Sequence, residues 1–242
     1  MSRYDFVIVG AGMAGASLAA GLAGKGRVLV IEAEDRPGYH ATGRSAAFWT
    51  ESYGGPQVLP LTTASGPFLK DHGLLTARSA LTLARAEEAQ GLAEFAAEFS
   101  ALGVRIEQLD RSRLEAIVPG LRGQWVLGVL EPDCCDIDVA ALHQLWLGQA
   151  RRGGAELACR SRLVAAQRSA SGWQLGLEDG SSLGCDVLIN AAGAWADPVA
   201  ELAGARALGV QPYRRTMVQL AMTSPVPRDL PLVLGLDGSF YF

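Results

Sequence analysis

The chain has 242 residues and a formal net charge of −4 at pH 7, with 49% hydrophobic and 19% charged residues. This composition supplies enough apolar side chains for a folded core and excludes an intrinsically disordered chain. It also lacks the basic excess of a nucleic-acid-binding protein, and no apolar run reaches the ~18 residues that a membrane-spanning helix requires.

The N-terminus, "MSRYDFVIVG", runs directly into an apolar segment without the features of a signal peptide. We therefore expect a cytoplasmic protein, with peripheral contact to the inner membrane left open. The run "YDFVIVG" predicts a strand buried on both faces. The segment "ASLAAGLAGKG" predicts a helix that ends near Gly24 to Gly26, and "RVLVIEA" predicts a second strand that ends at Glu32.

The turn between the first strand and the helix, "GAGMAG", is a G-x-G-x-x-G motif. Gly10 permits the tight turn, Gly12 lets a pyrophosphate approach the backbone, and Gly15 lets the helix pack closely on the strand. The helix N-terminus offers free N–H groups to phosphates. Glu32 is placed to accept hydrogen bonds from a ribose and would repel a 2′-phosphate. The unit therefore predicts dinucleotide binding and disfavours NADP.

The segment "EDRPGYHATGRSAAFW" follows where an NAD domain usually continues into another helix and strand. It is a loop with small residues at Ser45 and Ala46 and aromatic residues at Phe48 and Trp49. This pattern favours a long cofactor that lies extended, with backbone donors beneath its middle and rings near its reactive end.

The central segment predicts helices and strands in alternation. We expect helices over Pro56–Lys70 and Glu87–Leu102, a short helix from Asp110 to before Pro119, a helix capped by Asp138 that runs to Arg151, and strands over Leu81–Ala84 and Trp125–Glu131.

The C-terminal part is predicted to be mainly strand. "ELACRSRLVAAQRS" indicates a third strand that enters a hairpin, and Asp179-Gly180 is the turn of a second hairpin. "SSLGCDVLINAAGAW" indicates a parallel strand that ends in a small-residue turn. "RRTMVQLAM" and "LPLVLGLDGSFYF" are both predicted to form strands.

The four cysteines fit no disulfide framework, and the three histidines have no metal-ligand spacing, so we expect no metal site.

The chain resembles the D-amino-acid oxidase superfamily of FAD-dependent oxidoreductases, which includes glycine oxidase and sarcosine oxidase. Within it the chain is most similar to the bacterial D-arginine dehydrogenases. The resemblance rests on "VIVGAGMAGAS", "PGYHATGRSAAFW", "YGGPQV", "DIDVAALHQ", "LINAAGAWAD" and "LGVQPYRR". It implies an α/β fold with a Rossmann-like FAD-binding domain at 1–46 and 139–205. A mixed, β-rich substrate domain, C-terminally truncated, is expected at 47–138 and 206–242.

The resemblance implies FAD as the cofactor. The residues that it places near FAD are Gly10, Gly12, Ala14, Gly15, Glu32, Gly43, Arg44, Ser45, Ala46, Leu163, Ala192, Gly193 and Trp195. Glu32 would hold the adenosine ribose, the 43–46 segment the pyrophosphate and flavin, and backbone near Leu163 the adenine.

The resemblance also implies oxidative deamination of a D-amino acid. The Cα hydrogen passes as hydride to flavin N5, and the imino acid hydrolyses to a keto acid and ammonia. Arg215 is the expected partner of the substrate carboxylate, although it could instead be a surface arginine, with Arg214 beside it. Tyr53 and Tyr241 match tyrosines of the family pocket. A quinone or oxygen would accept the electrons.

Two positions depart from the D-arginine enzymes, which have glutamate at Ala80 and histidine at Phe48. Loss of that acid leaves a cationic substrate unpaired, so we expect a neutral, mainly apolar D-amino acid instead. Two alternatives stay open: a secondary-amine or 2-hydroxy-acid dehydrogenase on the same fold, and a non-catalytic flavin-binding subunit or inactive fragment.

The last residues, from Leu230 on, predict a strand, an Asp237-Gly238 turn and a second strand that has just begun. We expect this hairpin to lack its return pairing at Phe242, which exposes an apolar sheet edge. Family members continue past this point, so we expect a fragment that binds FAD weakly or not at all by itself.

Overall fold

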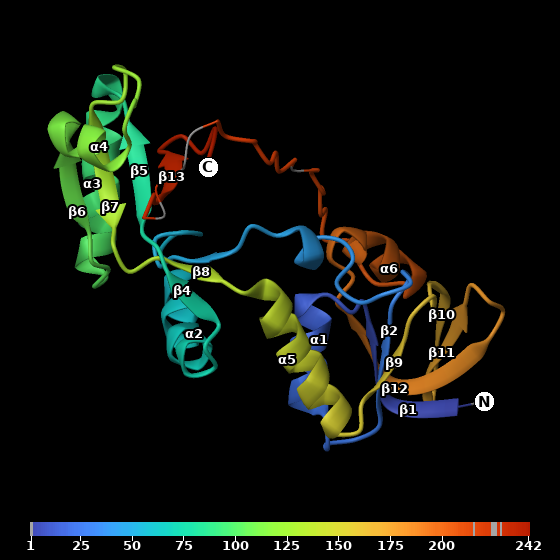
Figure 1. Cartoon of the computed structure of the whole chain (residues 1–242). Helices are drawn as coiled ribbons and strands as arrows, with labels where there is room; N and C mark the ends of the chain where they lie inside the picture. Colours follow the sequence, from blue (N-terminus) through green and yellow to red (C-terminus); the bar gives the residue numbers. More distant parts are fainter. Residues whose placement is uncertain (1, 215, 224–226, 228) are drawn as a thin grey trace. The chain divides into compact units, whose positions relative to one another are not determined.

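A computed structural model describes residues 2–214, 216–223, 227 and 229–242 (Figure 1). The chain divides into two compact units: unit 1 is Met1–Ala46 and Val139–Met217, and unit 2 is Ala47–Asp138 and Val218–Phe242. The sequence predicts boundaries after residues 46, 138 and 205, and the units divide after Ala46, Asp138 and Met217. Each unit is described by itself below.

Unit 1 is built on a six-stranded sheet in the order β10-β11-β12-β1-β2-β9. Strands β12, β1, β2 and β9 run parallel, whereas β11 pairs antiparallel with β12 and β10 pairs antiparallel with β11. Because four strands are parallel, their carboxyl ends meet at one edge, where ligands bind in open α/β sheets. The strand bounds are β1 Ser2–Val9, β2 Val28–Ile31, β9 Glu156–Ala158, β10 Leu163–Ser169, β11 Gly172–Leu177 and β12 Ser182–Asn190.

Both faces of this sheet are covered, which explains why β1 and β2 are almost continuously apolar. Ile8 packs on one face with Ala19 of α1 (Met13–Leu22) and Ala150 of α5 (Val139–Arg152). Val7 and Val9 point to the other face, towards Leu175 of β11 and Val199 of α6 (Ala196–Leu202). The alternation along β1 therefore divides the core of unit 1 into two layers, one on each face of the sheet.

Unit 2 contains a four-stranded sheet in the order β13-β5-β7-β6 and a three-stranded sheet in the order β3-β8-β4. Buried Leu81, Leu83, Leu114 and Val233 form the main core of this unit. Its elements are β3 Phe48–Trp49, α2 Leu59–Asp71, β4 Leu75–Ala77, β5 Ala80–Ala84, α3 Ala89–Ala101, β6 Glu107–Asp110, α4 Arg111–Ile117, β7 Leu127–Glu131, β8 Cys135–Ile137 and β13 Leu232–Gly235.

The predicted helices are present, with shifted ends. The third strand, predicted over 156–169, is instead two strands, since Arg160 has a φ of 52°: β9 pairs with β2, and β10 forms the hairpin with β11. Asp110 caps α4, because its Oδ1 accepts a hydrogen bond from the Arg113 amide at 3.0 Å. The Asp179-Gly180 turn joins antiparallel β11 and β12 as expected. Helix α2 begins at Leu59 instead of Pro56, and residues 56–58 form a turn in which the amides of Val58 and Leu59 donate to the Gly55 carbonyl oxygen.

Two predictions for the C-terminal segment are wrong. No strand forms among the described residues of 214–222, and Val218 and Leu220 are 69% and 75% exposed. An alternating apolar pattern is not sufficient for a strand, because a strand also needs a hydrogen-bonded neighbour. The hairpin at the end, by contrast, does have its return pairing: the amides of Val233 and Phe242 donate to each other's carbonyl oxygens at 2.8 and 2.9 Å.

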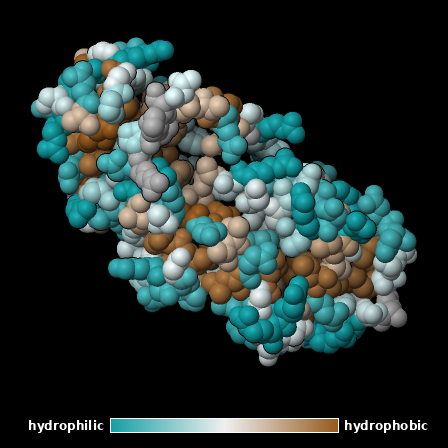
Figure 2. All heavy atoms as spheres, viewed as in Figure 1, coloured by the Kyte–Doolittle hydropathy of each residue, from teal (hydrophilic) through white to brown (hydrophobic). Residues whose placement is uncertain are grey.

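Hydrophilic side chains cover most of the face drawn in Figure 2, with apolar patches between them. Large exposed apolar side chains are frequent towards the C-terminus; they include Leu208, Tyr213, Val218, Leu220 and Met222. None of the helices in the described part of the chain is long and apolar enough to cross a membrane.

The 206–210 segment is held in unit 1 by Asp197 of α6, which explains why the unit extends beyond residue 205. One carboxylate oxygen accepts from the Leu208 amide at 2.9 Å, and the other accepts from the amides of Gly209 and Val210 at 2.8 Å. These backbone hydrogen bonds, that of Leu208 first, lower the pKa of Asp197 below its usual value of 3.8.

Replacing Asp197 with Ala should release this segment. We expect faster amide hydrogen exchange at Leu208, Gly209 and Val210, measured by mass spectrometry. Because the folded pKa is depressed, the stabilisation is complete above the usual carboxyl pKa and is lost as pH falls through the lower folded value. Protection in the wild type should therefore stay constant between about pH 5 and pH 8. Asp179→Ala, in another turn of unit 1, is the control, and equal exchange in both variants would contradict the assignment.

Candidate functional site

The glycine-rich turn after β1 adopts a backbone that other residues cannot reproduce. Gly10 has φ +103°, and a Cβ there would lie 2.5 Å from the Ala191 carbonyl oxygen. A Cβ at Gly15 would lie 1.9 Å from the Gly10 carbonyl oxygen. Both distances are far inside van der Waals contact. The turn therefore lies directly against the end of β12, and helix α1 lies directly against the turn.

Three groups from separate segments hold Ala11 inside this turn. The Glu32 carboxylate accepts a hydrogen bond from the Ala11 amide at 2.9 Å. His143 of α5 donates from Nε2 to the Ala11 carbonyl oxygen at 2.9 Å, and the Gly38 amide donates to the same oxygen at 3.1 Å. Glu32 and His143 are 9% and 5% exposed. The conformation of the turn is thus set by buried contacts and does not depend on a ligand.

The N-terminus of α1 leaves donors available for an anion. The amides of Ala14 and Gly15 have no hydrogen-bond partner within the described residues. The Met13 amide donates to Thr42 Oγ1 at 3.0 Å, which brings the 42–46 loop to the helix start. Free N–H groups at the positive end of a helix are suited to phosphate oxygens.

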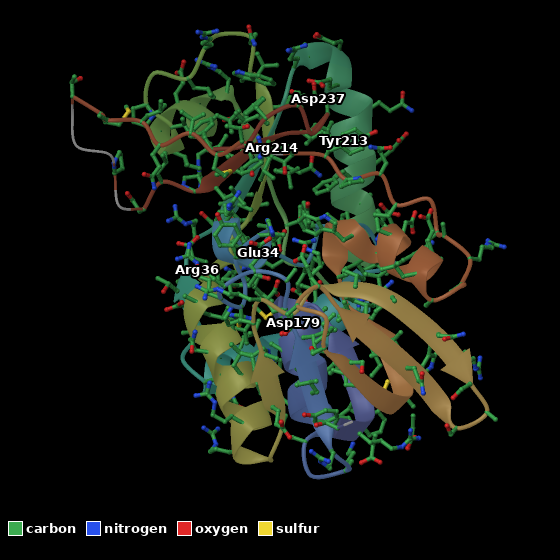
Figure 3. All side chains as sticks on the ribbon, turned by 90° about the vertical axis from the view of Figure 1, so that its right-hand side faces the viewer. Glu34, Arg36, Asp179, Tyr213, Arg214 and Asp237 are labelled. Carbon is green, nitrogen blue, oxygen red and sulfur yellow. The ribbon has the colours of Figure 1, made fainter. Side chains whose placement is uncertain are left out.

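The loop after β2 places cations beside this helix start. The guanidinium groups of Arg36 and Arg44 lie 5.0 and 4.9 Å from the centre of the Tyr39 ring. The His40 ring lies 4.5 Å from that of Trp195, and His40 Nε2 is 2.9 Å from the Glu34 carboxylate. Figure 3 labels Glu34 and Arg36 on this loop. Gly43, Arg44, Ser45 and Ala46 are all exposed.

The turn after β12 completes this edge of the sheet. Ala192 is half-buried, whereas Gly193 and Trp195 are exposed. Leu163, at the start of β10, is 7% exposed and its side chain belongs to the core of unit 1. The contact between the Leu163 backbone and the adenine stays a prediction.

These residues fit a dinucleotide with a pyrophosphate. The glycines leave room where any Cβ would fill it, the amides of α1 offer donors, and Arg44 offers a positive charge. Residues 5–242 match the DAO family, whose description is FAD dependent oxidoreductase. The chain belongs to this family. FAD is accordingly its cofactor, as predicted.

Individual relatives agree with the DAO family assignment. Hydrogen cyanide synthase subunit HcnC of Pseudomonas aeruginosa is 27% identical over 94% of this chain and 66% of its own. Glycine oxidase from Geobacillus kaustophilus has a TM-score of 0.78 at 21% identity, covering 97% of this chain and 66% of that one. L-α-glycerophosphate oxidase from Mycoplasma pneumoniae with FAD bound has a TM-score of 0.81 at 16% identity, covering 98% and 66%. The chain thus spans 66% of the length of these DAO-like proteins, and the two structures show the fold alone.

The DAO resemblance also marked residues of unit 2 as substrate contacts, and the structure brings three of them together. Ala80 is 4% exposed and packs with Cys134 and Leu232. Phe48 and Tyr241 pack against the same cluster. Tyr53 is separate from this cluster and is 62% exposed. Arg215 lies outside the described residues, and its neighbour Arg214, labelled in Figure 3, is exposed.

Sequence reasoning missed three residues whose side chains anchor turns, two in unit 1 and one in unit 2. Thr42, His143 and Glu131 were not singled out, and Glu32 was assigned to a ribose alone. A signal existed for Thr42, because it adjoins the 43–46 loop that was recognised. The contacts of His143 and Glu131 cross more than 70 residues of sequence, and no local pattern reports such pairs.

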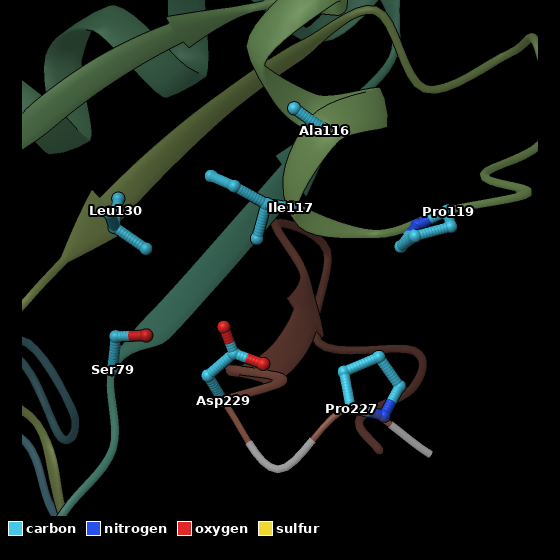
Figure 4. A pocket seen from close by; sticks show the side chains of 7 residues that line it. All are labelled: Ser79, Ala116, Ile117, Pro119, Leu130, Pro227 and Asp229. Carbon is cyan, nitrogen blue, oxygen red and sulfur yellow. The ribbon is translucent and has the colours of Figure 1, made fainter. Parts of the chain in front are cut away.

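A separate pocket in unit 2 lies between α4, the start of β5 and the segment before β13 (Figure 4). Ala116, Ile117, Pro119 and Leu130 form apolar walls, and Ser79 and Asp229 supply polar groups. None of the residues assigned to FAD or substrate lines this pocket.

Two of the four cysteines, Cys134 and Cys185, are buried. Burial raises the pKa of the Cys134 thiol to about 12 and that of Cys185 to about 11. Both therefore stay protonated at neutral pH, and a thiol reacts as the thiolate. Among the described residues, no group of histidine, cysteine and acidic side chains could hold a metal ion.

Proposed function

We propose that this protein oxidises the α-amine of a neutral, mainly apolar D-amino acid. FAD, when bound, supplies the acceptor for the hydride that leaves Cα. The other product is an imino acid, which water hydrolyses to a keto acid and ammonia. The DAO family match over residues 5–242 is the observation that carries the redox part of this proposal.

The protein's own residues have the tasks of binding and orientation. Arg215 is proposed to pair with the substrate carboxylate, because a guanidinium presents two parallel donors to that group. Tyr53 and Tyr241 are proposed to donate further hydrogen bonds to the substrate. In unit 1 the turn from Gly10 to Gly15 and the 43–46 loop hold FAD.

The surroundings of Ala80 support a neutral substrate side chain. Ala80 packs among apolar residues, and its cross-strand partner on β7 is Glu131. The Glu131 carboxylate already accepts three hydrogen bonds, from Thr50, Glu51 and Ser52. These neutral donors hold the carboxylate towards the 50–52 turn and leave its charge in place, so the support for a neutral substrate side chain is the apolar packing of Ala80.

A D-amino-acid panel tests this specificity. We expect D-Met, D-Leu or D-Phe to reduce the flavin with a kcat/KM at least about tenfold above that for D-Arg, the scale of roughly 1–3 kcal/mol for apolar pocket fit. The measurement is anaerobic bleaching of the flavin absorption, with the L-enantiomers and a 2-hydroxy acid as controls. A preference for D-Arg would refute the assigned role of Ala80, and reduction by the hydroxy acid alone would favour the alternative dehydrogenase.

A second candidate function is that of a flavin-binding subunit within a larger assembly. The observation that favours it is the 27% identity, over 94% of this chain, to a protein named as a subunit, HcnC. Stable association with a partner chain, together with no flavin reduction by any small amino acid, would support this function over the first.

A further inference from the structure

Glu131 is a buried acid of unit 2 to which the proposed reaction gives no task. It ends β7 and is 3% exposed. Its Oε1 accepts from the Glu51 amide at 2.7 Å, and its Oε2 accepts from Thr50 Oγ1 at 2.8 Å and Ser52 Oγ at 2.5 Å. One carboxylate therefore binds three consecutive residues of a turn, and these bonds offset the cost of its burial.

The turn that Glu131 binds leads directly to Tyr53. The Tyr53 amide donates to the Thr50 carbonyl oxygen at 3.4 Å, so the backbone nitrogen of Tyr53 is held by the turn. Tyr53 is 62% exposed, and the next two residues are Gly54 and Gly55 in the left-handed region. Glycine has the widest range of allowed backbone conformations, so Gly54 and Gly55 do little to fix Tyr53. The residues before Tyr53, which Glu131 binds, therefore determine its position.

The same carboxylate joins this turn to the strand that carries Ala80. Ala80 and Glu131 are directly paired across β5 and β7, so their side chains lie on one face of the sheet. The turn is tied on its other side as well, because Thr63 of α2 donates to the carboxylate of Glu51. Glu131 thus connects the 50–53 segment to strand β5, and so fixes the distance between Tyr53 and Ala80.

We propose that Glu131 is a positioning residue that fixes the Thr50–Ser52 turn and thereby sets Tyr53 for the substrate. It touches neither substrate nor cofactor and acts through Tyr53. The inference rests on the proposed function, since it assumes that Tyr53 contacts the amino acid.

A double-mutant cycle in the FAD-loaded protein tests this inference. Glu131→Ala should lower kcat/KM for the best D-amino acid by about tenfold, because a small displacement of a positioning group is costly. In a Tyr53→Phe background the same change should cost less than about twofold, since interacting residues are not additive. Equal losses in both backgrounds would overturn the proposal.

Glu131→Gln keeps the shape and supplies a rescue test. Its amide oxygen can accept from Glu51, and its NH₂ can donate to the two hydroxyls, which are acceptors as well. We expect activity close to wild type, whereas Thr50→Val should lose part of it. Thr82→Val is the matched control, because Thr82 lies on neighbouring β5 without a hydrogen bond of its hydroxyl among the described residues.

Hydrogen exchange separates this inference from the proposed function. The Glu51 amide should exchange faster in Glu131→Ala than in the wild type and Thr82→Val, whatever the substrate. Unchanged exchange would refute the anchoring role. A wild-type protein that anchors the turn but oxidises no amino acid would refute the proposed function and, with it, the role of Tyr53.

Discussion

Replacing Gly15 with alanine is expected to abolish flavin retention. The new Cβ would lie 1.9 Å from the Gly10 carbonyl oxygen, which is backbone and cannot rotate away. Helix α1 must then move off the turn and carry the Ala14 and Gly15 amides with it. Overpacking of this kind costs about 3 kcal/mol, which corresponds to roughly a 100-fold loss of affinity. The measurement is the ratio of flavin absorption to protein after purification, together with Kd for added FAD.

Gly21→Ala is the matched control on the same helix. Nothing lies within 4 Å of a Cβ at Gly21, and this position is exposed. Alanine there should leave flavin content unchanged and stabilise the helix by about 0.5–1 kcal/mol. Equal flavin content in the two variants would show that close packing at Gly15 does not govern the cofactor site.

Replacing Glu32 with glutamine should weaken FAD binding by about 5- to 150-fold, the equivalent of roughly 1–3 kcal/mol for one unsatisfied buried group. The two carboxylate oxygens accept from the amides of Ala11 and Glu34 at 2.9 and 3.0 Å. An amide side chain offers one acceptor, so its NH₂ must face one of these donors. The measurement is Kd for FAD by fluorescence titration.

The stability of the FAD-free protein distinguishes the two roles of Glu32. If the carboxylate only holds the turn, Tm of the FAD-free variant falls in parallel with affinity. If it also binds the ribose, Glu32→Gln loses more affinity than the fall in Tm explains. Glu178→Gln, at an exposed ion pair of the same unit, is the control. Unchanged Kd in Glu32→Gln would contradict both roles.

Local patterns in the sequence were sufficient for the first β1-α1-β2 segment of unit 1. The apolar runs of β1 and β2, the glycines between them and the acid at position 32 lie close together in the chain. Their roles follow from backbone sterics and strand periodicity. The Asp179-Gly180 hairpin and the Asp110 cap were predicted for the same reason, because each interaction spans only a few residues.

The tertiary structure alone decided which distant groups meet. His143 reaches Ala11, and Glu131 reaches Thr50, through contacts that depend on how strands and helices assemble. Strand pairing also depends on how distant parts of the chain assemble. The 214–222 segment was predicted to be a strand, but its described residues form none, and the end of the chain pairs Val233 with Phe242 against expectation. A hydrogen-bonded neighbour is a property of the assembled sheet, whereas a turn or a cap is encoded within a few residues.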